Sequence, residues 1–333
     1  MEDRILLGHG SGGRLMYQLI REHFVPRFEM KSLNDSAVLK GLNKGKVALT
    51  TDSYVVSPVF FPGGNIGELA IYGTVNDLSM VGARPLYITA GLILEEGFAL
   101  SDLKKILTAM SEAAEKADVK IVAGDTKVVN KGKADGIFIN TSGVGIVDEG
   151  IDISPSKVKP GDRVILSGSI GNHGVAIMAE RNGLSFNPPV ISDTAPLNGL
   201  VKEMLRKTRK IHAMRDPTRG GLATTLKEIA SDSGYCIVIE ETLIPVPPGV
   251  KGACELLGLD PLYVANEGIL SAIVSADVAE PLVKTMRKHP LGKEARIIGE
   301  VQKSPAGMVL LKTSIGGTRI IEMLSGDQLP RIC

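Results

Sequence analysis

The sequence predicts an α+β protein of two domains, and three observations support this prediction. The chain has 333 residues, which at about 100–200 residues per domain is enough for two hydrophobic cores. Apolar patterns typical of strands and of helices follow one another in a mixed order, neither strictly alternating nor all strand. Turn-forming residues gather over 150–162. We therefore expect one domain over residues 1–153, a second over 154–324, and a mobile tail over 325–333.

The first half begins with an alternation of strands and helices. Residues 46–57 are rich in Val and Thr and precede Pro58, which is typical of a strand. Apolar residues at helical spacing predict a helix over Asn65–Met80, although Gly73 weakens the pattern. A second strand is expected over 86–94, directly after Arg84-Pro85.

The remaining elements are predicted by the same two periodicities. Ser101 is expected as the N-cap of a helix that runs to Ala117, and strands follow over 119–123 and 136–147. A strand over 163–168 opens the second domain. Its further helices are expected near 173–182, 197–209, 219–232 and 277–288, and its further strands near 235–240, 267–275 and 296–302.

Composition narrows the function classes. Lys and Arg total 38 and Asp and Glu total 37, so the net charge is +1, without the basic excess typical of nucleic-acid-binding proteins. The first residues carry no basic region followed by a long apolar stretch, and no window approaches about 18 consecutive apolar residues. We expect a cytoplasmic protein whose partners include no nucleic acid and no membrane.

Aspartates recur in short polar or glycine-rich segments beside apolar runs. Carboxylates placed at strand ends can hold Mg²⁺, which binds oxygen and keeps waters and substrate phosphates as ligands. Any single Asp in such a segment is more often only a turn or cap residue, so the prediction of a nucleotide site depends on their recurrence. The recurring residues are Asp35, Asp52, Asp77, Asp125 and Asp216.

Two glycine-rich stretches could offer main-chain amides to phosphate. They are Gly8–Gly13, before an expected helix, and Gly220-Gly221, before the helix from Leu222. Neither has the Gly-Lys-Ser/Thr of a P-loop, and the first has no preceding strand as a dinucleotide fingerprint requires. Each is equally consistent with an ordinary turn.

The three cysteines do not form a disulfide framework, because their number is odd and the chain is long. Cys236 lies in a strand pattern and Cys254 in a helical one, so both are expected to be buried packing residues. Cys333 is the last residue. Its own carboxylate tends to raise the pKa of its thiol, and Arg331 can oppose that effect. It is either an incidental terminal residue or a reactive thiol, and we favour the second.

At its end the chain resembles a known family. The terminal Pro330-Arg331-Ile332-Cys333 is similar to the end of the HypE family, which supplies cyanide ligands to the iron of nickel–iron hydrogenase. Elements around Asn76-Asp77-Leu78 and within 215–221 also resemble the wider aminoimidazole ribonucleotide synthetase (PurM-like) superfamily, which by itself implies only ATP use. Further similar segments are 51–56, 60–64, 82–85, 122–129 and 266–268.

The resemblance implies a two-domain PurM-like fold. The mixed sheet of the N-terminal domain would form a β-barrel-like interface in a homodimer, with ATP in the groove between, and the C-terminal α+β domain would end in a flexible tail. It also implies the activity of a carbamoyl dehydratase. HypF would place a carbamoyl group on Cys333, ATP-dependent dehydration would convert this thiocarboxamide to a thiocyanate, and HypC and HypD would receive the cyanide.

The expected chemistry assigns roles to individual residues. Glu267, which stands between Asn266 and Gly268, and Lys127, which follows Asp125, are the expected bases, although Lys127 is also consistent with an ordinary phosphate-binding cation. The expected Mg²⁺ ligands are Asp35, Asp52, Asp77 and Asp125. The expected ATP-binding residues are Asp35, Asp52, Asn76, Asp77, Asp125, Thr126, Asp216, Arg219, Gly220 and Gly221.

Two other functions compete with this interpretation. An ATP-dependent kinase or amide-activating synthetase of the same superfamily could act on a free substrate, but the motif that ends in Cys333 argues against it. A non-catalytic carrier could only present the thiol, but the intact Asp52, Asp77 and Asp125 argue against that.

Overall fold

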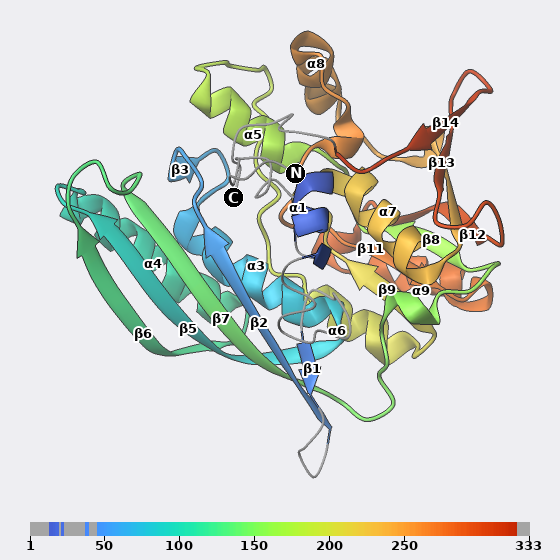
Figure 1. Cartoon of the computed structure of the whole chain (residues 1–333), viewed down its shortest axis with the longest axis horizontal. Helices are drawn as coiled ribbons and strands as arrows, with labels where there is room; N and C mark the ends of the chain where they lie inside the picture. Colours follow the sequence, from blue (N-terminus) through green and yellow to red (C-terminus); the bar gives the residue numbers. More distant parts are fainter. Residues whose placement is uncertain (1–12, 20, 23–36, 40–44, 325–333) are drawn as a thin grey trace.

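The computed structural model describes residues 13–19, 21–22, 37–39 and 45–324 (Figure 1). The predictions for Asp35, for Cys333 and for the tail over 325–333 lie outside the described residues.

The first half of the chain forms a five-stranded mixed sheet. Its strand order is β1-β2-β7-β5-β6, and every pair is antiparallel except β5 with β6, which is parallel. Helices α3 (Ile66–Met80) and α4 (Leu100–Lys116) pack against one face of this sheet (Figure 1). The strands are β1 (Ala37–Leu39), β2 (Lys46–Tyr54), β5 (Ala83–Glu95), β6 (Lys120–Val129) and β7 (Ile137–Val147).

The other face of this sheet carries no helix among the described residues. Side chains along β7 alternate between buried and half-buried positions, as expected for a sheet with one covered face. Strand β6 lies at an edge, and nearly all its residues are exposed. Short elements complete this half: α1 (Arg14–Leu19) and the hairpin of β3 (Phe60–Phe61) and β4 (Gly64–Asn65).

The second half forms a seven-stranded sheet with helices on both faces. Its strand order is β14-β13-β10-β12-β8-β11-β9. Alternate residues of β8 point to opposite faces, Ile165 toward the cluster that includes α6 and α9, and Leu166 toward the cluster that includes α7. The strands are β8 (Arg163–Leu166), β9 (Ile211–Arg215), β10 (Cys236–Glu240), β11 (Ser271–Val274), β12 (Arg296–Gln302), β13 (Val309–Lys312) and β14 (Thr318–Ile321). The helices are α5 (Asn172–Arg181), α6 (Asn198–Lys207), α7 (Gly221–Ser233), α8 (Pro248–Leu257) and α9 (Ala276–Met286).

One hydrophobic cluster belongs to both halves. Leu78 and Met80 at the end of α3 pack with Leu200 of α6 and Leu282 of α9, and all four side chains are fully buried. The two sheets are therefore joined by a continuous core. None of the helices in the described residues has both the length and the apolar character needed to cross a bilayer.

The α+β class and the mixed first sheet are confirmed, and the predicted helices and strands all have counterparts. Two details were wrong. Helix α4 begins at Leu100 after Ala99, so Ser101 is not its N-cap. Strand β6 continues beyond its expected end at Ala123 to Val129 and contains Asp125, because it pairs with β5 along that whole length. The boundary between residues 153 and 154 stays a prediction.

Candidate functional site

Polar side chains from both halves of the molecule meet in one pocket. Strand β2 and helix α3 contribute from the first half, and the β9–α7 loop and the segment before β11 contribute from the second. The lining residues are Asp52, Ser53, Tyr54, Gly73, Asp77, Asp216, Thr218, Arg219 and Glu267. Five predicted site residues therefore lie together: Asp52, Asp77, Asp216, Arg219 and Glu267.

The alternation of β2 places its even-numbered side chains on the α3 side. The hydroxyl of Thr50 donates to Asp77 Oδ2 at 2.8 Å, which fixes the carboxylate on the helix. Tyr54 packs against Gly73, where a Cβ atom would lie 2.3 Å from the tyrosine hydroxyl. Gly73 weakens the helical pattern, and the close approach of Tyr54 explains why a glycine stands there. Asp52 thus lies in strand β2 and Asp77 in helix α3, within the strand and the helix that were expected over 46–57 and 65–80.

Arg219 connects the two halves across the pocket. Its guanidinium lies 3.4 Å from Asp52 Oδ1, and both side chains are about one-third exposed, so the pair adds little stability. The two glycines that follow have positive φ, +75° for Gly220 and +60° for Gly221, and form the start of α7. The Gly221 amide donates to the carbonyl of Thr218 at 3.0 Å, so in this structure it is engaged within the loop.

Glu267 is the most deeply placed acid of the pocket. Its side chain is buried with only 4% of the residue exposed. Burial raises the pKa of Glu267 well above its usual range, and the neighbouring Asp216, Asp193 and Asp52 raise it further, while Arg219 lowers it. A carboxyl of this kind keeps its proton to higher pH than an ordinary glutamate, which makes it a candidate for general acid–base chemistry.

Buried carboxamides hold the main chain around Glu267. Asn266 donates to the carbonyls of Pro217 at 2.9 Å and Val264 at 3.1 Å, and its Oδ1 accepts from the amide of Gly171 at 2.6 Å. Both loops that line the second-half side of the pocket are therefore fixed by one side chain.

Asn76, a predicted ATP-binding residue, is also fully buried. Its side-chain amide donates to the carbonyls of Ala195 at 3.1 Å and Glu267 at 3.4 Å, and its Oδ1 accepts from the amide of Leu197 at 2.7 Å. These contacts point to a structural role, in which Asn76 ties α3 to the main chain beside Glu267.

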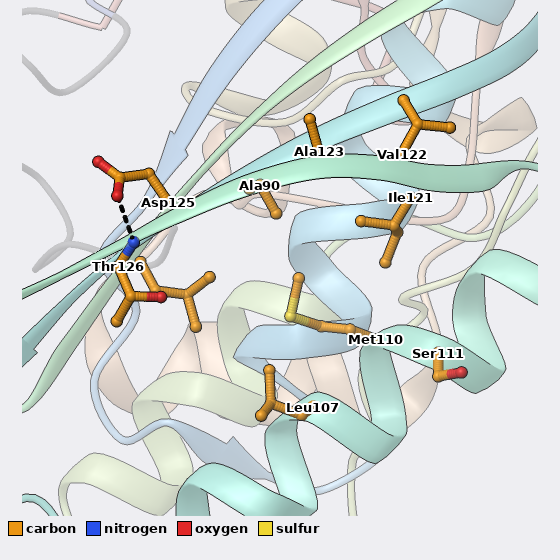
Figure 2. Close-up of a pocket in the computed structure, with 11 residues that line it drawn as sticks. Ala90, Leu107, Met110, Ser111, Ile121, Val122, Ala123, Asp125 and Thr126 are labelled. Atoms are coloured by element: carbon orange, nitrogen blue, oxygen red, sulfur yellow. Dashed lines mark hydrogen bonds between the residues drawn. The ribbon is translucent and has the colours of Figure 1, made fainter.

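Asp125, Thr126 and Lys127 lie outside this pocket. They belong to edge strand β6, where Asp125 and Thr126 line a separate groove of about 570 Å³ against α4. Figure 2 shows the two side chains on opposite sides of the strand, with Thr126 on the side of Leu107 and Met110. Lys127 lies 2.9 Å from Asp125 Oδ2 and, together with the Thr126 amide, lowers the pKa of Asp125. Glu267 and Lys127, the two expected bases, therefore do not share a pocket within one chain.

The predicted Mg²⁺ site stays a prediction. Among the described residues, no group of three or more His, Cys, Asp or Glu side chains is placed to hold a metal ion. Mg²⁺ needs fewer protein ligands when it binds with a nucleotide, because one or two carboxylates then suffice beside phosphates and waters. Asp52 and Asp77, which line the same pocket, fit that requirement.

Sequence reasoning missed the residues that support the pocket. Thr50, Tyr54 and Asp193 belong to no phosphate or metal motif, and only the periodicity of β2 could have indicated the first two. Cys236 and Cys254 are buried, which confirms their prediction as packing residues.

Comparisons with known proteins cover both halves of the chain. Residues 33–147 match the family described as AIR synthase related protein, N-terminal domain, and residues 159–312 match its C-terminal domain. A carbamoyl dehydratase HypE from Cupriavidus necator is 54% identical over 99% of this chain and 95% of its own length.

Solved structures agree with this relationship. The chain is similar to one in a HypE–HypF complex, with a TM-score of 0.87 and 50% identity over 92% of this chain and 99% of that one. It is also similar to a hydrogenase maturation protein HypE in complex with ATP, with a TM-score of 0.85 and 46% identity over 99% of this chain and 100% of that one.

Proposed function

This chain belongs to the HypE family of carbamoyl dehydratases, within the AIR synthase related proteins, and we propose that it dehydrates a carbamoyl group carried on its own Cys333. The observation that carries this proposal is the buried Glu267 in a pocket lined by Asp52, Asp77, Asp216 and Arg219. The relatives act in hydrogenase maturation, and one of them binds ATP.

The chemistry requires that an amide lose its oxygen and both of its nitrogen-bound protons. An amide oxygen is a poor leaving group, but as a phosphate ester, after phosphoryl transfer from ATP, it departs readily as phosphate. The C–O bond then breaks while the C≡N bond forms, so the thiocarboxamide becomes a thiocyanate. One nitrogen proton is released to solvent when the oxygen is phosphorylated and ADP leaves, which gives an imidate. Glu267 accepts the second nitrogen proton as phosphate departs, and its burial limits the access of bulk water to this step.

The acidic residues near the pocket mouth suit a nucleotide with Mg²⁺. Asp52 and Asp77 would hold the ion, which when bound neutralises the charge on the phosphates. Arg219 faces them from the opposite side and would bind phosphate oxygens. Asp125 and Lys127 lie on strand β6, away from the Glu267 pocket. They could act on the same nucleotide only if the nucleotide extends between the two places or if a second chain brings its own β6 to the pocket.

The described chain just before the tail supports intramolecular delivery. The hydroxyl of Tyr263 donates to the carbonyl of Glu322 at 2.9 Å, and Lys227 lies 3.1 Å from the Glu322 carboxylate. Tyr263 is four residues from Glu267, so Glu322 lies within about 25 Å of Glu267 through the chain and one side chain. The nine residues 325–333 can span about 30 Å, which is sufficient for Cys333 to reach the pocket.

We also propose the partners that this cycle needs. A HypF protein would load the carbamoyl group onto Cys333, in agreement with the HypE–HypF complex among the similar structures. HypC and HypD would accept the cyanide. The uncovered face of the five-stranded sheet, with Leu49, Tyr87 and Ile93 exposed, would pair two copies as a homodimer.

The test follows the mass of the C-terminal peptide after incubation with HypF, carbamoyl phosphate and ATP. We expect carbamoylation of Cys333 and then loss of water only when ATP is present. An unmodified peptide beside ATP turnover on a small molecule would instead support a free-substrate enzyme, and modification without dehydration would support a carrier. Cys333→Ala should bind ATP and form no product, whereas Cys254→Ala, which changes a buried thiol, should retain activity.

A further inference from the structure

A short segment between α5 and α6 lies directly against the turn that carries Glu267. We call residues 192–197 the strap. Its Ser192 amide donates to the carbonyl of Pro62 at 2.9 Å, and its Leu197 amide donates to Asn76 Oδ1 at 2.7 Å. The strap is thereby attached at both ends to the first half of the molecule, although it belongs to the second.

Asp193 of the strap binds the Glu267 turn. Its Oδ2 accepts from the main-chain amides of Glu267 at 3.1 Å and Gly268 at 2.9 Å. The two segments touch so closely that a Cβ atom on Gly268 would lie 1.7 Å from the Asp193 carbonyl oxygen. A third link runs from the Ala195 amide to the Glu267 carbonyl at 3.3 Å.

The position of Asp193 is costly, which indicates a purpose beyond filling space. Its Oδ1 is buried and accepts no hydrogen bond of ordinary geometry among the described residues, although the main-chain amides of His173 and of Asp193 itself lie near enough to lower the pKa of the carboxyl. Burial raises the pKa of Asp193 to about 6, although the nearby amides of Gly268 and Glu267 lower it. An asparagine would bind the same amides without a buried charge, so stability alone does not explain the carboxylate.

We propose that Asp193 is a positioning residue, which fixes the main chain of Glu267 and Gly268 and thereby directs the Glu267 carboxyl into the pocket. Two amides bound to one carboxylate leave the turn a single conformation, and charge-assisted hydrogen bonds are the stronger kind. Because the strap is also attached to Asn76 and Pro62, the direction of Glu267 is set relative to Asp52 and Asp77 as well. This inference rests on the proposed role of Glu267 as a base.

The test compares Asp193→Ala and Asp193→Asn with the wild-type chain in single-turnover dehydration of the carbamoylated protein. A shift of the base by about 1 Å costs about 100-fold, so Asp193→Ala should dehydrate about 100-fold more slowly. ATP binding and carbamoyl loading should remain within about twofold of wild type, because Asp193 does not line the pocket. Asp193→Asn keeps an oxygen acceptor, so its dehydration rate should be about tenfold higher than that of Asp193→Ala.

Hydrogen exchange measures the same contact independently of activity. The amides of Glu267 and Gly268 should exchange faster in Asp193→Ala than in Asp193→Asn or wild type. The matched control is Glu95→Ala, which also removes a carboxylate that accepts two main-chain amides, those of Gly132 and Gly136, away from the pocket. It should leave dehydration unchanged.

The outcomes separate this inference from the proposed function. Wild-type dehydration together with an unimpaired Asp193→Ala variant overturns the positioning role and leaves the proposed function intact. Absence of dehydration in the wild-type chain overturns the proposed function, and the exchange rates then still decide whether Asp193 holds the turn. If Asp193→Ala does not fold, a fully active Asp193→Asn variant with fast-exchanging amides overturns the inference.

Discussion

At the scale of single residues, Glu267 carries the clearest conflict between stability and function. A buried carboxyl with a raised pKa binds protons more tightly in the folded than in the unfolded chain, so the folded state loses stability as pH rises above the usual glutamate pKa. This loss continues until the pH reaches the raised pKa. A neutral side chain at position 267 would make the folded state more stable, so the presence of a carboxyl there is explained by activity and not by packing.

We predict that Glu267→Gln is more stable than wild type in metal-free buffer and inactive in dehydration. The gain in free energy of unfolding should increase as pH rises from about 5 toward the raised pKa, by up to about 1.4 kcal/mol per pH unit. Urea unfolding at several pH values measures this gain. Glu255→Gln, at an exposed position of α8, is the control and should change stability by less than about 0.5 kcal/mol. A gain independent of pH would contradict the prediction.

The residue types in the sequence indicated the acids that line the pocket, but not the residues that hold those acids in place. Asp52, Asp77 and Asp216 were identified because carboxylates beside Gly, Thr and Asn recur along the chain, and the structure places them in one pocket. Asp193 carries no such signal, because its partners are main-chain amides that lie 74 and 75 positions later in the sequence. Contacts of this range depend on the path of the chain, which no local pattern encodes.

At the scale of elements, α3 is stabilised by Asn65, the residue directly before it. Asn65 Oδ1 accepts from the amides of Gly67 at 2.8 Å and Glu68 at 3.3 Å, and its Nδ2 donates to Glu68 Oε2 at 3.1 Å. Asn65 is therefore the N-cap of α3, and its side-chain contact with Glu68 adds a second link across the first turn. Since α3 also carries Asn76 and Asp77, the cap supports the pocket from the other end of the helix.

We predict that Asn65→Ala lowers the free energy of unfolding by about 1 kcal/mol, because two helix amides lose their acceptor. Asn65→Ser retains an oxygen acceptor and should lose only part of this amount. Urea denaturation followed by far-ultraviolet circular dichroism gives both values. If Asn65→Ala and Asn65→Ser are equally stable, the oxygen acceptor at position 65 does not contribute to stability and the prediction is wrong.

Periodicity predicted the buried elements well and the edge poorly. The helix over 65–80 was expected because its apolar spacing is regular, and α3 has nearly those bounds. Strand β6 was expected to end at Ala123, because Gly124 and Asp125 resemble a turn. Gly124 and Asp125 both disfavour strands, but hydrogen bonds to β5 keep them in the extended conformation, although β6 is paired on one side only.

At the scale of the whole molecule, the five-stranded sheet leaves apolar side chains uncovered. Leu49, Tyr87 and Ile93 lie on the face opposite α3 and α4, and each is more than one-third exposed. An uncovered apolar face of a sheet is typical of an association surface. It is the physical support for the predicted homodimer.

We predict that the wild-type chain is a dimer and that combined Tyr87→Lys and Ile93→Lys substitutions convert it to a monomer, because four lysines would then lie within the proposed interface. Size-exclusion chromatography with light scattering measures the mass. Leu256→Lys alters a residue that is 71% exposed on α8 and should leave the mass unchanged. A double variant that remains dimeric would place the interface elsewhere.

The core shared by the two sheets has a mechanical consequence. Leu78 and Met80 pack against α6 and α9, so a hinge-like opening of the two halves would expose fully buried apolar surface. Exposing this surface costs about 25 cal/mol of free energy for each Å². The walls of the pocket therefore keep one spacing from one turnover to the next. If Cys333 carries the substrate, as we propose, the substrate must come to a pocket whose walls stay in place.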